Sequence, residues 1–133
     1  MKNILPSRHT FRKEERLSGK KKVDELFSSG SSFYLPPLKV IAVSTERSDE
    51  PSVPVQVLIT VSSKNVPRAV DRNRIKRRIR EAYRLNKYLL YDELKKLNKK
   101  LLLGFVYTSK KIEPFPLIQE KVIASLQKIS AQL

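Results

Sequence analysis

The segment from Arg72 to Asn86 constrains the fold of this chain more than any other, because its sequence is typical of an amphipathic helix with two very different faces. Apolar residues recur there at helical spacing and form one stripe, consisting of Ile75, Ile79, Ala82 and Tyr83. Asp71 precedes the segment and is a suitable N-cap. We therefore expect a helix that packs its apolar stripe against the rest of the fold.

The opposite face of this helix is cationic and carries Asn73, Lys76, Arg77, Arg80 and Arg84. Solvated helix faces usually alternate acids with bases, but Glu81 is the only acid between Arg72 and Arg84. Like charges at this spacing repel, so the pattern favours a face that binds a polyanion. Arginine dominates, and its guanidinium group binds phosphate at two points, which favours nucleic acid. For Asn73, contact with a base edge or 2′-hydroxyl and local capping both stay open.

The overall charge also points to nucleic acid. The chain has 133 residues, with 28 Lys and Arg against 13 Asp and Glu, for a net charge of +15. An anionic membrane surface is the weaker alternative, since the longest apolar run, 101–107, is too short to span a bilayer and the start lacks a signal-peptide pattern. The absence of cysteine excludes disulfides, thiolate nucleophiles and zinc-finger ligation, and we expect a cytoplasmic protein.

The remaining periodic segments predict a single domain over residues 1–133, in which residues 1–17 form an extended basic arm that is partly mobile. A short helix is expected over 19–29, capped by Ser18 and stopped by Gly30. After a loop over 31–37, strands at 38–44 and 53–61 are expected to form a hairpin, in which Pro54 precedes the second strand or lies on an edge. We further expect a helix over 89–99, a buried strand over 101–108 and a helix over 115–129.

Catalytic groups are hard to assemble from this sequence. His9 is the sole imidazole, and most carboxylates are adjacent pairs that a helix would direct apart. We therefore expect no catalytic and no metal-ligating residue. Aromatic residues near the arm could stack on unpaired bases. Phe27 lies on the apolar face of its predicted helix, which favours a core position and leaves a position on the surface open. Phe33 and Tyr34 are the better candidates for exposure, whereas Tyr83, Phe105 and Tyr107 are expected in the core.

The basic helix closely resembles the signature motif of the protein subunit of bacterial ribonuclease P. The matching residues are Ala69-Val70-x-Arg72-Asn73-Arg74-x-Lys76-Arg77-x-x-Arg80-Glu81. Supporting matches upstream are Phe11-x-Lys13, Arg16-Leu17, Leu26-Phe27-x-x-Gly30 and Val61-Ser62-Ser63-Lys64. The resemblance covers the chain from about Phe11 to Leu126. It implies an α/β (α+β) two-layer sandwich with a four-stranded mixed sheet, a left-handed βαβ crossover and a ribosomal-protein-like architecture.

The resemblance also implies a function. In this family the RNA subunit cleaves the 5′ leader from precursor tRNA, with Mg²⁺ held by the RNA, and the protein supplies affinity and positioning. The implied partners are the catalytic RNA and precursor tRNA, with no membrane and no protein partner. The residues carried over as contacts of the RNA subunit, or as supports for such contacts, are Arg72, Asn73, Arg74, Lys76, Arg77 and Arg80. Those assigned to the leader are Phe11, Arg12, Arg16, Val23, Phe27, Phe33 and Tyr34.

One position departs from the family. Val23 stands where the first helix of family members has a second aromatic residue, which favours apolar contact over base stacking at that point. Two other functions stay as alternatives. The first is a non-catalytic RNA-binding or ribosomal-protein-like module, and the second is a protein-only nuclease, which would require carboxylates that converge in space.

Overall fold

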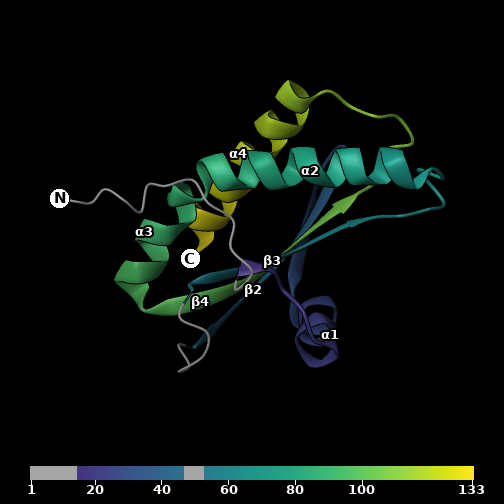
Figure 1. The fold of residues 1–133 in the computed structure, drawn as a ribbon. Helices are drawn as coiled ribbons and strands as arrows, with labels where there is room; N and C mark the ends of the chain where they lie inside the picture. The colour runs from purple at the N-terminus through teal and green to yellow at the C-terminus, as the bar shows by residue number, and fades with distance from the viewer. Residues whose placement is uncertain (1–14, 47–52) are drawn as a thin grey trace.

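The computed structural model describes residues 15–46 and 53–133 (Figure 1). Helices and strands follow one another along this part of the chain in the predicted order, with one additional strand. The elements are α1 (Lys20–Ser29), β1 (Ser31–Leu35), β2 (Leu38–Glu46), β3 (Val55–Val61), α2 (Ala69–Asn86), α3 (Tyr88–Leu97), β4 (Lys99–Tyr107) and α4 (Phe115–Gln132).

The strands form one mixed sheet in the order β1-β2-β4-β3. β2 is antiparallel to both β1 and β4, whereas β3 is parallel to β4. The predicted hairpin between the segments 38–44 and 53–61 is therefore wrong, because β4 lies between them. β4 is buried on both faces, so its apolar side chains are best covered when it has a neighbour on each side. The prediction for Pro54 is confirmed, since β3 begins at the next residue and lies at the edge of the sheet.

The segment 31–35 is a strand, although the sequence predicted a loop there. It pairs with β2 in a tight hairpin whose turn contains a cis peptide bond between Pro36 and Pro37. The five residues of β1 are exposed or half-buried, so the segment lacks the buried alternation that identifies a strand from sequence. The pairing with β2, and not the burial of its own side chains, therefore makes this segment a strand.

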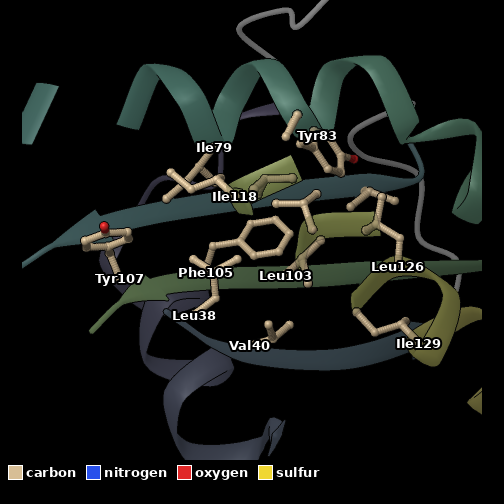
Figure 2. Packing of buried hydrophobic residues seen from close by; sticks show 14 of the residues in the cluster. Leu38, Val40, Ile79, Tyr83, Leu103, Phe105, Tyr107, Ile118, Leu126 and Ile129 are labelled. Atoms are coloured by element: carbon tan, nitrogen blue, oxygen red, sulfur yellow. The ribbon is translucent and has the colours of Figure 1, made fainter. Parts of the chain in front are cut away.

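Three helices cover one face of the sheet, and α1 lies on the other (Figure 1). α2, α3 and α4 enclose the main core with alternate residues of the strands. Figure 2 shows Ile79 and Tyr83 of α2 directed toward Phe105 and Leu103 of β4. The Tyr83 and Phe105 rings meet edge to face, with centroids 6.4 Å apart. This arrangement is the four-stranded sandwich implied by the family resemblance, and it confirms the core positions predicted for Tyr83, Phe105 and Tyr107.

The buried stripe of α2 was predicted correctly, whereas the predicted N-caps of α1 and α2 were wrong. The buried residues of α2 are the four predicted ones, and α3 follows directly after Lys87 with Leu90 and Leu94 buried. However, α2 begins at Ala69, so Asp71 lies in its first turn, where its negative charge suits the helix dipole, and is not the cap. Ser18 does not cap α1 either, because Gly19 occupies the N-cap position with a φ of 93°.

The end of the predicted arm packs along the free edge of the sheet. Arg16 forms a parallel bridge with Val57 of β3, and the Leu17 amide donates a hydrogen bond of 2.8 Å to the Val57 carbonyl. Leu17 is buried beneath α1, with Leu26, Ile41 and Leu102 in a second, smaller core. Residues 1–14 of the arm lie outside the described residues.

Candidate nucleic-acid interface

The exposed face of α2 carries a set of cationic side chains, and the opposite face of the helix packs against the main core. Its four buried residues fix the helix to the sheet, which leaves the opposite face in solvent. Arg72 and Lys76 of the predicted set are half-buried, and the exposed members are Asn73, Arg74, Arg77 and Arg80. We call these four residues the α2 face. A helix anchored in this way presents guanidinium groups to a ligand with little further ordering of the backbone.

Arg72 supports the start of α2. Its Nη1 donates hydrogen bonds to the carbonyl oxygens of Val66, at 3.0 Å, and Pro67, at 2.7 Å. These bonds hold the loop before α2 against the first turn of the helix. Arg72 is therefore a support for the α2 face, a role that the sequence analysis had left open beside direct contact.

The two acids of α2 lie next to arginines that are close in sequence, one within the helix and one at its N-cap. Glu81 accepts hydrogen bonds from Arg84, at 3.0 Å from Nε and 2.5 Å from Nη2. The hydrogen bonds from Arg84 hold the pKa of Glu81 below its usual range. Asp71 lies 3.9 Å from Arg68, one turn away. Neither carboxylate therefore offsets the charge of the α2 face, and Arg84 is engaged with Glu81.

A second surface lies on the opposite side of the sheet, around α1. Phe27 is 51% exposed there, so the core position that its helix face favoured is wrong, and the surface position that stayed open is the one observed. The ten-residue helix contacts the sheet along one line, and Leu26 alone among its residues is fully buried. Phe27 follows Leu26 by one residue and is therefore turned away from that line. Val23 is half-buried and packs against the same small core.

Phe33 and Tyr34 lie on opposite faces of the sheet, because they are adjacent in a strand. Tyr34 is 57% exposed, and it pairs in register with Lys39, two residues from Ile41 of the core beneath α1. It therefore shares a face with α1, and its hydroxyl lies 3.0 Å from Thr108 Oγ1. Phe33 packs against the main core instead, with Lys128 Nζ 4.9 Å from its ring centroid.

The structure thus places Val23, Phe27 and Tyr34 on one face and separates Phe33 from them. Arg16 is exposed at the edge of β3. Phe11 and Arg12, the other predicted leader contacts, precede the described residues.

Two interactions that position α2 were missed by the sequence analysis. Arg78 Nη1 donates a hydrogen bond of 2.5 Å to the Glu113 carbonyl and so ties α2 to the loop before α4. Lys87 forms a buried ion pair with Glu15. In each pair the two residues are far apart in sequence, so residue spacing gives no signal for either contact.

Within residues 15–46 and 53–133, no three His, Cys, Asp or Glu side chains come close enough together to hold a metal ion. The protein-only nuclease, which requires such a cluster, therefore gains no support from this part of the chain. None of the helices described there is long and apolar enough to cross a membrane.

A mixed sheet covered by three helices makes this an α+β domain, and its cationic helix face and exposed aromatics are features typical of RNA-binding domains. Comparison with known proteins identifies the family. The family model described as Ribonuclease P matches residues 11–127. The chain belongs to this family, whose protein subunits act in tRNA 5′ processing.

Individual relatives agree with this assignment. A ribonuclease P protein component of Porphyromonas gingivalis is 33% identical over 128 residues, which cover 96% of this chain and 92% of the relative. One from Chlorobaculum tepidum is 43% identical over 99 residues, covering 69% of this chain and 63% of the relative.

Solved structures agree on the fold. The ribonuclease P protein of Thermotoga maritima has a TM-score of 0.65 at 21% identity, covering 86% of this chain and 96% of that one. That of Staphylococcus aureus has a TM-score of 0.62 at 23% identity, covering 88% and 95%.

Proposed function

We propose that this chain binds the catalytic RNA of ribonuclease P through the α2 face and the 5′ leader of precursor tRNA through the surface around α1. The observation that carries the proposal is the α2 face itself, which presents three exposed arginines and one asparagine while both acids of the helix are paired locally. Structured RNA offers the matching phosphates.

The α2 face suits the backbone of a folded RNA for geometric reasons. Arg74 and Arg77 lie three residues apart on a helix, so their guanidinium groups lie near one another on one side. Each can bind a phosphate at two points, and each phosphate contact releases counterions. Asn73 lies on the same exposed surface and can donate to and accept from a base edge or a 2′-hydroxyl.

The surface around α1 suits a single strand. Phe27 and Tyr34 offer exposed aromatic rings to unpaired bases, and Val23 adds apolar contact. Arg16 at the edge of β3 supplies charge for the phosphates. Lys22 also contributes to this side, and its Nζ donates a hydrogen bond of 3.0 Å to Gln56 Oε1 of β3.

The proposal assigns the chemistry to the RNA. Mg²⁺ bound by the RNA would activate water and stabilise the leaving oxygen, so that cleavage leaves a 5′-phosphate on the tRNA. The protein contributes affinity for the precursor and its placement. Such a protein would work in the cytoplasm, where precursor tRNA is made.

The test is cleavage of a 5′-labelled precursor tRNA at low Mg²⁺ by the protein alone, by a bacterial ribonuclease P RNA alone, and by their mixture. We expect efficient cleavage at the mature 5′ end only in the mixture. If the protein leaves the activity of the RNA unchanged, the alternative of a non-catalytic RNA-binding module is favoured. Cleavage by the protein alone would overturn the assignment of the chemistry to RNA.

A further inference from the structure

A buried ion pair joins the N-terminal segment to the end of α2. Lys87 Nζ lies 2.9 Å from both carboxylate oxygens of Glu15. The two residues are only 8% and 3% exposed. The Tyr91 hydroxyl donates a further, longer hydrogen bond of 3.4 Å to the carboxylate, and Lys87 Nζ lies 5.3 Å from the Tyr91 ring centroid.

Lys87 occupies the joint between two helices. It ends α2 and precedes α3, and its carbonyl accepts the Leu90 and Tyr91 amides at 2.9 and 3.2 Å. Glu15 therefore contacts the point at which the RNA-facing helix changes into the next one. The contact spans 72 residues of sequence.

Glu15 is also one of three consecutive residues, 15–17, that contact the rest of the fold. Arg16 forms the bridge to Val57, and Leu17 is buried beneath α1. Since Glu15 contacts α2 and α3 while Leu17 belongs to the core under α1, the segment passes the edge of β3 from one face of the sheet to the other. The ion pair thus fixes the segment at the point where it lies next to the end of α2.

A buried ion pair often stabilises a fold no more than two apolar residues of similar size would, so its net stabilisation does not explain the arrangement. Its geometric effect is larger, because two hydrogen-bonded oxygens specify one position of the chain. The residue that it fixes lies next to Arg16 and follows a sequence that contains Arg12 and Lys13.

We propose that Glu15 is a positioning residue, which is held by Lys87 at the α2–α3 joint and so aligns the neighbouring Arg16 for the leader of precursor tRNA. This inference rests on the proposed function and adds a residue to it that touches no RNA itself. It predicts that loss of the ion pair weakens binding of the leader without weakening the attachment of the α2 face to the catalytic RNA.

The test compares Glu15→Gln, Lys87→Met and the double variant with the full-length wild type, each reconstituted with the catalytic RNA. We expect the preference for precursor over mature tRNA to fall about three- to tenfold in each single variant. The double variant should show no greater loss, because the two residues act through one contact. Affinity for the catalytic RNA alone should stay within about twofold of wild type, whereas a merely structural role would lower both. Lys95→Ala, an exposed lysine on α3, is the matched control and should change neither quantity.

A second readout needs no RNA and separates this inference from the proposed function. Trypsin cleavage after Arg16 in the free protein requires local opening of the segment, so Glu15→Gln should accelerate it at least about fivefold while cleavage after the exposed Lys110 keeps its rate. If wild type shows no preference for precursor but the Arg16 site is released as expected, the proposed function fails and the structural attachment by Glu15 stands. Unchanged cleavage after Arg16 together with an unchanged precursor preference would overturn the inference.

Discussion

Gly30, at the end of α1, lies so close to Ile41 of β2 that a Cβ at position 30 would stand 2.6 Å from Ile41 Cγ2. The same Cβ would approach the Leu26 carbonyl oxygen to 2.5 Å, and the Gly30 amide donates a hydrogen bond of 2.9 Å to that oxygen. The absence of a side chain at Gly30 therefore allows α1 to end directly against the sheet.

Gly30→Ala should lower the free energy of unfolding by about 1–3 kcal/mol, because the added methyl group meets both a backbone carbonyl and a buried side chain. Urea denaturation measures this quantity. Ser31→Ala, at the exposed neighbouring position, is the control and should change it by less than about 0.5 kcal/mol. A Gly30→Ala protein as stable as wild type would show that α1 can move away from Ile41 at no cost.

Arg72→Ala should weaken both the fold and the binding of catalytic RNA. The two loop carbonyls that Arg72 satisfies lose their partner, which we expect to lower the unfolding free energy by about 1–2 kcal/mol. Arg77→Ala is the matched comparison, because Arg77 is exposed on the same helix and should affect RNA binding with little change in stability. Equal stability of the two variants in urea would contradict the supporting role of Arg72.

Phe27→Ala should reduce affinity for leader-bearing precursor by about 1–2 kcal/mol and leave affinity for mature tRNA unchanged, because the exposed ring is available to one or more unpaired bases. Its exposure also means that the fold should survive, as circular dichroism would show. Leu26→Ala provides the contrast, since removal of this fully buried side chain should cost about 2–5 kcal/mol of stability. Equal losses of affinity for precursor and mature tRNA in Phe27→Ala would show that Phe27 does not contact the leader.

The buried tyrosines make the fold sensitive to alkaline pH. Burial raises the pKa of Tyr83, Tyr91 and Tyr107 in the folded protein. Above the ordinary tyrosine pKa of about 10, the unfolded chain loses these protons while the folded protein keeps them, so stability is complete below that pH and falls as pH rises further. Absorbance at 295 nm should show tyrosine ionisation in a cooperative step that coincides with loss of circular dichroism. Ionisation of all five tyrosines with the dichroism unchanged would contradict this burial.

The sequence predicted those features that one segment determines alone. The stripe that begins at Ile75 faces the core, β3 begins after Pro54, and α4 begins at Phe115 as predicted. The pairing of β2 could not be predicted in the same way, because it depends on how β4 is covered, and β4 follows some fifty residues later. The position of β1 likewise depends on its partner, since its own side chains are largely exposed.

The candidate site likewise has features that one segment determines alone and features that depend on residues distant in sequence. Helical geometry and charge predicted the exposure of Asn73, Arg77 and Arg80. Lys76 and Arg84 of the same predicted face are half-buried, and Arg74 was indicated by the family motif alone. The position of Phe27 was not, because it depends on which side of a short helix contacts the sheet. Neither the Arg72 bonds to the loop nor the pairing of Glu15 with Lys87 could be deduced from spacing, since both require the folded arrangement.

The salt dependence of binding to the catalytic RNA tests the central claim most directly, namely that the α2 face contacts that RNA. Labelled RNA would be titrated with wild type, with the Arg74→Ala/Arg77→Ala double variant, and with Lys95→Ala/Lys96→Ala, which removes the same charge from exposed positions of α3. The slope of log affinity against log salt should shrink by roughly 1.5–2 for the α2 variant, because two phosphate contacts are lost. The α3 variant should keep a slope close to that of wild type. Equal slopes for the two double variants would show that net charge, and not the α2 face, determines binding.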